Sequence, residues 1–117
     1  MTINILGTPY EIIVKKYNED KMFENQDCDG YTITATHKIV LCDLYSFDRW
    51  KDETEEVVSA YSKQTLKHEI VHAFLAESGL CQNSNETSAW ATNEEMVDWI
   101  ALQGNKIHKA WKEADAI

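Results

Sequence analysis

The feature that most constrains the fold of this chain is the segment HEIVH, from His68 to His72. Two histidines four residues apart on an α-helix lie about 40° apart around the axis, one turn above the other, so both imidazoles can face one ion. Glu69 lies about 100° from His68 and about 60° from His72, where its carboxylate can reach a water on that ion. This geometry is typical of zinc hydrolases.

The motif belongs to a helix that we expect to span residues 53–78. Asp52, followed three residues later by Glu55, is typical of an N-cap with a capping box, and Gly79 is typical of a C-cap. A wide apolar arc faces away from the two histidines and consists of Leu66, Ile70, Val71, Phe74 and Leu75. A helix that is apolar over so much of its circumference is expected to be largely buried.

A catalytic zinc site takes three protein ligands, so a third His, Asp or Glu is expected on an element that packs against this helix. Residue 93 starts a second predicted helix, and Glu94 and Asp98 share one of its faces. One can bind the metal while the other accepts the free N–H of a ligating histidine. Glu95 is a rival ligand, although its position in the first turn suits a charge that complements the helix dipole. The expected buried side is formed by Met96, Val97, Ile100 and Ala101 and, past a weak point at Gly104, by Ile107 and Trp111.

The rest of the chain predicts a small sheet. Residues 3–6 and 10–17 are rich in Ile, Val and Tyr and flank a glycine-proline turn, which predicts a hairpin. Residues 31–44 alternate and then become continuously apolar, which predicts two more strands with a turn near residues 36–38. The polar segments 18–30, 43–52 and 80–92 are expected to be loops. We therefore expect an α+β fold, in which a short antiparallel sheet packs on the motif helix and the second helix follows.

Length and composition predict one domain over residues 1–117, with 44% hydrophobic residues and a single proline. The net charge of −9, from 20 acids against 11 lysines and arginines, argues against a nucleic-acid partner. The sequence contains neither an apolar run that could span a bilayer nor a leader-like N-terminus, so we expect no membrane association and a cytoplasmic location. Cys28, Cys42 and Cys81 form no CxxC pair and are expected to be reduced thiols.

These motifs resemble those of the gluzincins, the thermolysin-like zinc metallopeptidases, whose pattern is HExxH followed by N-E-x-x-x-D. The matching positions are His68, Glu69, His72, Asn93, Glu94 and Asp98, with Glu94 lying 22 residues after His72. The whole chain is also similar to small metallopeptidase-like proteins encoded by bacteriophages and prophages, in which a short sheet and two helices form the entire protein. The resemblance implies a minimal zincin-like domain, zinc as the metal, and a protein or peptide substrate in the host cytoplasm.

The resemblance also implies a role for each matched residue. It implies His68, His72 and Glu94 as zinc ligands, Asp98 as the carboxylate that holds His68, and Asn93 as the residue that orients His72. Zinc at this site would lower the pKa of its bound water toward neutrality and polarise the scissile carbonyl. Glu69 would be the general base that takes the proton from this water and passes it to the leaving amine.

The chain differs from the larger gluzincins because it has no room for the second helical domain that supplies a transition-state His or Tyr. The candidate substitutes are Tyr31, His37, Tyr45 and His108, and the sequence does not choose among them. The strand near Lys38 to Cys42 is expected at a sheet edge beside the cleft, where an extended peptide could pair with it. Trp90 could line the cleft, since its loop leads directly into the second helix.

Two other functions fit the same residues. One is a zinc-stabilised protein-binding module of the same fold with little or no catalytic turnover. The other is a non-haem iron site built from two histidines and one carboxylate. The adjacent Glu69 argues against iron, because iron oxygenases do not need that base. The sequence names neither the substrate nor the oligomeric state.

Overall fold

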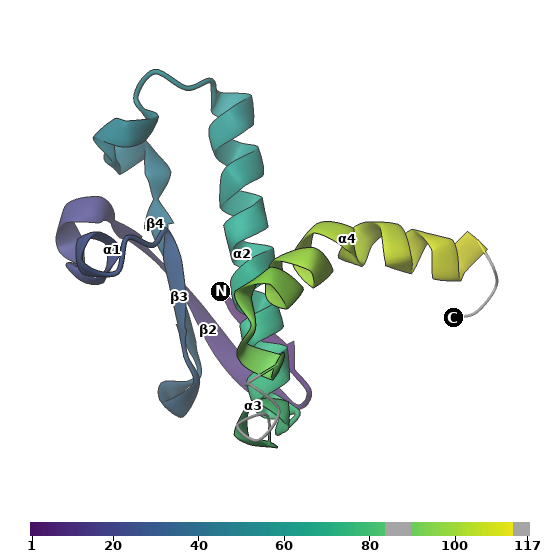
Figure 1. The fold of residues 1–117 in the computed structure, drawn as a ribbon. Helices are drawn as coiled ribbons and strands as arrows, with labels where there is room; N and C mark the ends of the chain where they lie inside the picture. The colour runs from purple at the N-terminus through teal and green to yellow at the C-terminus, as the bar shows by residue number, and fades with distance from the viewer. Residues whose placement is uncertain (84–89, 114–117) are drawn as a thin grey trace.

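The structure is a computed structural model that describes residues 1–83 and 90–113. It has an α+β fold in which a four-stranded sheet packs against one long helix (Figure 1). The strands are β1 (Thr2–Ile5), β2 (Thr8–Lys16), β3 (Gly30–Ile33) and β4 (Lys38–Asp43). The α-helices in the described residues are α1 (Met22–Asn25), α2 (Glu55–Glu77), α3 (Leu80–Asn83) and α4 (Glu94–Glu113). None of these helices is both long and apolar enough to cross a membrane.

The sheet has the strand order β1-β2-β4-β3 and is mixed. The β1–β2 and β3–β4 pairs are antiparallel, as the two predicted hairpins require, but β2 and β4 run parallel, with Glu11 opposite Lys38. The prediction of a purely antiparallel sheet is therefore wrong. The chain passes through β3 before it returns as β4 between β2 and β3, and this return makes the β2–β4 pair parallel.

The position of β4 also contradicts the prediction that the strand near Lys38 to Cys42 lies at a sheet edge. This strand is the most apolar of the four, and Ile39, Val40 and Cys42 are all buried. A strand that buries both of its faces is favoured in the interior of a sheet. The edge position beside α2 is taken by β3, which pairs with β4 alone.

Helix α2 begins later than the sequence predicts. Its N-cap is Thr54, whose hydroxyl accepts a hydrogen bond from the Val57 amide at 3.3 Å, so the proposed cap at Asp52 is wrong. Glu55 and Glu56 lie in the first turn, where negative charge complements the helix dipole. The C-cap is Ser78 rather than Gly79. Gly79 follows it with a φ of +81°, the left-handed conformation that commonly ends helices.

The side of α2 that faces the sheet is buried, but the helix is not buried all round. Leu66, Ile70 and Ala73 pack against the sheet residues Tyr10 and Ile39. Leu75 is buried as predicted, whereas Phe74 is 41% exposed. The prediction of a largely buried helix is therefore only partly correct, because the four short strands cover one side of α2.

All three of the predicted loops contain short helices, and residues from them complete the core. The segment 18–30 includes α1, whose Phe23 is buried against Val40. The segment 43–52 includes the 3-10 helices η3 (Leu44–Ser46) and η4 (Asp48–Trp50), and Leu44 is buried with Val58 of α2. The predicted loop 80–92 includes α3 and the 3-10 helix η6 (Trp90–Thr92), and its residues 84–89 lie outside the described residues.

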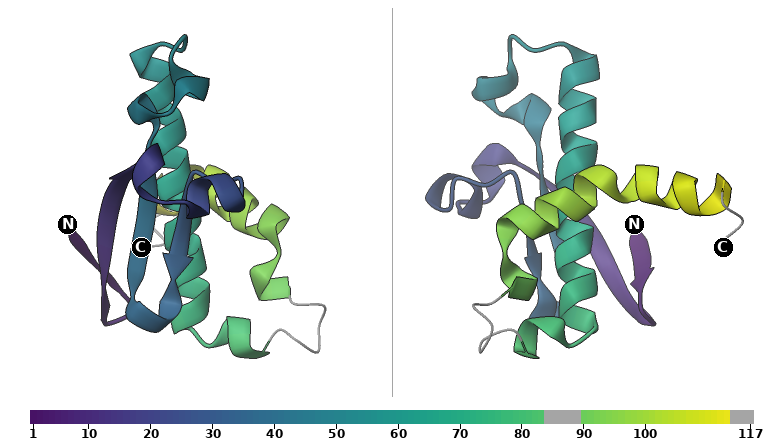
Figure 2. Two further views of the ribbon diagram at one scale, coloured as in Figure 1. Left: turned by 90° about the vertical axis from the view of Figure 1, so that its left-hand side faces the viewer. Right: turned by 45° about the vertical axis from the view of Figure 1, so that its right-hand side comes forward.

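Helix α4 crosses α2 and then projects beyond the sheet (Figures 1 and 2). Asn93 precedes it, and the Asn93 side-chain oxygen accepts a hydrogen bond from the Met96 amide at 2.9 Å, as an N-cap does. Val97 and Ala101 are buried as predicted, while Met96, Ile100 and Ile107 are half-buried. The helix continues through Gly104, and the side chain of Trp111 lies outside those that the structure describes.

Candidate metal centre

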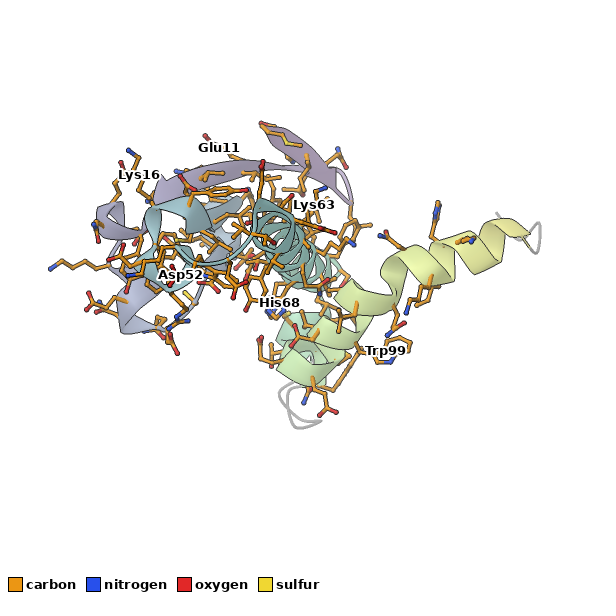
Figure 3. The ribbon with its side chains drawn as sticks, turned by 90° about the horizontal axis from the view of Figure 1, so that it is seen from above. Glu11, Lys16, Asp52, Lys63, His68 and Trp99 are labelled. Atoms are coloured by element: carbon orange, nitrogen blue, oxygen red, sulfur yellow. The ribbon has the colours of Figure 1, made fainter. Side chains whose placement is uncertain are left out.

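The two histidines of α2 meet a glutamate from the first turn of α4. His68 and His72 bring their Nε2 atoms within 3.0 Å of each other. Glu94 lies against both, with Oε2 at 3.0 Å from His68 Nε2 and Oε1 at 3.1 Å from His72 Nε2. Figure 3 shows His68 on the side of α2 that faces α4. Two neighbouring turns of α2 and the distant first turn of α4 thus place one potential metal-ligating atom each from His68, His72 and Glu94 within 4.8 Å of the others.

A fourth side chain holds the outer nitrogen of His68. Asp98, one turn after Glu94 on α4, lies with Oδ1 at 2.5 Å from His68 Nδ1. Because an ionised carboxylate can only accept, the hydrogen in this contact belongs to Nδ1. The neutral imidazole of His68 then presents a bare lone pair at Nε2, and this is the form in which a histidine binds a metal.

Hydrogen bonds alone do not satisfy this cluster. With His68 protonated at Nδ1, the three contacts among His68 Nε2, His72 Nε2 and the Glu94 carboxylate share at most one hydrogen, that of His72. A second proton, on His68 Nε2, would make His68 a cation and would leave two N–H groups facing each other across the 3.0 Å contact between the two Nε2 atoms. A cation among these atoms would instead attract every lone pair that faces it.

The distances also suit a small divalent cation. In a tetrahedral zinc site with bonds of about 2.0–2.1 Å, the ligand atoms lie about 3.3 Å from one another. The three distances in the cluster, 3.0, 3.0 and 3.1 Å, are within a few tenths of an ångström of that value. Two imidazoles and one carboxylate are a donor set found at catalytic zinc, and they leave one coordination position for water. His68, His72 and Glu94 therefore fit such an ion.

The predicted general base lies beside this cluster and is held in place. Glu69 is only 6% exposed and is the one buried charged residue in the described part of the chain. Its Oε2 accepts a hydrogen bond of 2.7 Å from the hydroxyl of Thr32 on the edge strand β3. A buried carboxylate without such a donor would be costly. The sequence did not point to Thr32, because nothing local indicates which helix residue a strand side chain will meet.

One cavity of about 720 Å³ connects these groups. It is bounded by α2, by the start of α4, and by the loop from α1 into β3, and it contains His68, His72, Glu69 and Glu94 in its wall. Asp27, Asp29 and Asp98 also line it, and none of its described lining residues is lysine or arginine. A metal bound to the histidines would therefore face a wide, acidic cavity that borders an edge strand.

The four candidate transition-state donors do not converge on the cluster. The Tyr31 hydroxyl donates to Asp20 Oδ2 at 2.5 Å, and burial together with this hydrogen bond raises the pKa of Tyr31 to about 12. Tyr31 lines the cavity, but its hydroxyl is engaged by Asp20. His37 lies beside Glu77 and not beside the cluster, with its Nε2 at 3.7 Å from Glu77 Oε1. Tyr45 and His108 are exposed and lie outside the cavity wall.

Three further residues that the sequence placed at or near the site, Trp90, Asn93 and Glu95, have surroundings that differ from those predicted. Trp90 is 43% exposed and does not line the cavity, but Tyr61 of α2, which the sequence did not single out, does. Asn93 acts as the cap of α4, and no described contact joins it to His72. Glu95 is exposed and is not among the three ligand residues that come together.

None of the three cysteines is among the residues whose ligand atoms come together in the cluster. Cys28 and Cys81 line the cavity, and Cys42 is buried in the core below α1. Burial raises the pKa of each of these thiols, so each is a weaker nucleophile and metal ligand than an ordinary cysteine. The geometry therefore gives them no part in the cluster.

Comparison of the chain with protein-family models, with curated protein sequences and with solved structures gives no match.

Proposed function

We propose that this protein is a zinc-dependent metallopeptidase of the minimal, gluzincin-like type. The observation that carries the proposal is the convergence of His68 Nε2, His72 Nε2 and the Glu94 carboxylate at mutual distances of 3.0–3.1 Å. The short contact between His68 and Asp98 supports it, since ligating histidines commonly donate their second N–H to a carboxylate. The cytoplasm, of a host cell if the gene is carried by a phage, is the proposed location.

The residues of this chain divide the work of peptide hydrolysis between them. His68, His72 and Glu94 would hold zinc, which supplies an acidified water and polarises the substrate carbonyl when bound. Glu69, next to the ligands in the same cavity wall, is placed to accept a proton and return it to the leaving amine. Asp98 keeps the His68 proton on Nδ1, so that Nε2 stays free to bind.

The edge strand suggests how a peptide would bind. β3 pairs on one side with β4, and its residues Gly30 and Thr32 line the cavity. An extended peptide could add to the outer side of β3 by main-chain hydrogen bonds and so cross the front of the metal cluster. β3 thus replaces β4 as the strand with which a peptide could pair. The strand order excludes β4, because both of its edges are already paired within the sheet.

One observation favours a second function, a zinc-stabilised protein-binding module with little turnover. The hydroxyl of Tyr31 is occupied by Asp20, and His37, Tyr45 and His108 lie away from the cavity. None of these four side chains is thus positioned to stabilise negative charge on a tetrahedral intermediate. A binding module needs the zinc ligands but not such a donor.

The first experiment measures bound metal in the purified full-length protein and in two matched variants. We expect one zinc per wild-type chain, loss of the zinc in Glu94→Ala, and retention of it in Glu95→Ala, because Glu95 is the neighbouring acid on the same helix turn. A wild-type chain that takes up no zinc after reconstitution would refute the metallopeptidase.

A second variant separates the enzyme from the binding module. Glu69→Gln keeps the size of the side chain and removes the base. If the protein is a peptidase, this variant should bind zinc normally and lose cleavage of proteins in the host extract by a factor of 10² or more, roughly the contribution of a general base. If zinc-loaded wild-type protein captures a partner but cleaves nothing, the binding module is the correct function.

A further inference from the structure

The buried carboxylate of Glu69 depends on a residue from another element. Thr32, on β3, is 37 positions away in the sequence and donates its hydroxyl to Glu69 Oε2 at 2.7 Å. The same hydroxyl oxygen lies 3.1 Å from the main-chain oxygen of Glu69. The shorter contact is the one to an ionised acceptor, and charge-assisted hydrogen bonds are the stronger kind.

The close approach of β3 to α2 explains why the short side chain of Thr32 can reach Glu69. Gly30 and Thr32 are two residues apart on β3 and therefore point to the same side of the strand. A Cβ on Gly30 would lie 2.9 Å from Cγ2 of Thr65, which is one helical turn before Glu69 on α2. Only glycine leaves room for this approach, because the stiff, β-branched Thr65 side chain cannot move aside freely.

From this geometry we infer that Thr32 is a positioning residue for Glu69, an inference that rests on the proposed function. Its hydroxyl fixes one carboxylate oxygen, so that Oε1 is the oxygen left to act on a substrate or inhibitor group in the cavity. A freely rotating carboxylate would have to lose that freedom in each reaction, and positioning of reacting groups is a large part of catalysis. Gly30 contributes indirectly, because it allows β3 to lie close to α2.

A merely structural role for Thr32 would have a different result. If the hydroxyl only satisfied a buried carboxylate, its loss would destabilise the fold but would not weaken a ligand that uses Glu69. The informative probe is a simple hydroxamate, which chelates zinc through its two oxygens and carries an O–H that a neighbouring carboxylate can accept. Its affinity reports on the position of Glu69 without any turnover.

The experiment uses the zinc-loaded full-length protein and compares wild type with Thr32→Val, which keeps the shape and removes the hydroxyl, and Thr32→Ser, which restores it. Calorimetry measures the affinity for zinc and then for benzohydroxamate. We expect zinc affinity to change by less than about twofold in both variants. Hydroxamate affinity should fall about tenfold in Thr32→Val and return in Thr32→Ser. With a cleavable substrate, Thr32→Val should lower kcat and leave KM nearly unchanged.

The same change in a Glu69→Gln background provides the control. If Thr32 acts through Glu69, Thr32→Val should have no further effect on hydroxamate binding there. Should Thr32→Val fail to fold, Thr32→Cys, with a side chain of similar size and a weaker donor, replaces it and is expected to weaken hydroxamate binding severalfold. Equal hydroxamate affinity in the wild type and the folded variant overturns this inference alone, whereas absence of zinc binding by the wild type overturns the proposed function.

Discussion

Two glutamates, Glu77 in the last turn of α2 and Glu94 in the first turn of α4, have surroundings that are opposite in kind. Near the end of α2, Glu77 accepts one hydrogen bond at each oxygen, from the hydroxyls of Thr8 and Tyr10, both at 2.8 Å. At the start of α4, Glu94 presents its two oxygens to the Nε2 atoms of His68 and His72. Each of these two hydrogen bonds at Glu77 has its own hydrogen. The contacts among Glu94, His68 and His72 share at most one hydrogen while His68 is neutral.

This difference separates a structural carboxylate from a candidate functional one. The Glu77 cluster ties the start of β2 to the end of α2, and a satisfied polar network of this kind stabilises a unique fold. The cluster around Glu94 leaves its lone pairs facing one another, and its carboxylate side chain is 66% exposed, so it contributes little to the fold without a further partner. A cation is the partner that its chemistry calls for.

The largest expected effect tests this contrast directly. Zinc at one hundred times its dissociation constant should stabilise the protein by about 2.7 kcal/mol and raise Tm by on the order of 10 °C. Glu94→Gln should abolish this response, since it removes a ligand charge. Glu77→Gln should lower the starting Tm but keep the zinc-induced rise. Thermal denaturation with zinc and with chelator measures both, and a zinc response that survives in Glu94→Gln would break the comparison.

A smaller effect is expected from replacing Asp98, the carboxylate that contacts His68 Nδ1. Asp98→Ala should weaken zinc binding by about 10–100-fold, because it removes the carboxylate that fixes the proton on His68 Nδ1. Competition with a chromophoric chelator measures the affinity, and Glu95→Ala is the matched control on the same helix. If Asp98→Ala binds zinc as tightly as wild type, Asp98 is only a surface acid.

The smallest expected effect concerns the structural cluster. Tyr10→Phe removes one of the two donors to Glu77 and should lower Tm by roughly 4 °C at neutral pH, with zinc binding unchanged. Hydrogen bonds from Tyr10 and Thr8 hold the pKa of Glu77 below its usual 4.5, so their stabilisation is present above that pH. It is lost as the pH falls through the lower pKa of the folded state.

At alkaline pH the dependence of stability on pH has the opposite sign. Burial and the hydrogen bond to Glu77 raise the pKa of Tyr10 to about 12, so the stability from neutral Tyr10 is present below pH 10 and is lost between pH 10 and about 12. Tyr10→Phe should therefore reduce the dependence of Tm on pH in both ranges. A Tyr10→Phe profile parallel to that of the wild type at acid pH would show that Glu77 does not need this donor.

Sequence reasoning succeeded where a few consecutive residues decide the outcome. The spacing of His68 and His72 and that of Glu94 and Asp98 each predicted a shared helix face, and the structure brings the two faces together. It failed at the cap of α2, because Asp52 and Thr54 are both good capping residues and only Thr54 has the amide of Val57 in reach.

The sequence by itself determined the helical faces and the two hairpins, because helical periodicity and turn chemistry are local properties of the chain. Only the tertiary structure decided that β4 lies inside the sheet and β3 at its edge. It also decided that the Thr32 hydroxyl donates to Glu69 and that the Tyr31 hydroxyl donates to Asp20. Strand order and side-chain partners depend on which buried surfaces pack together, and residues distant in the sequence contribute those surfaces.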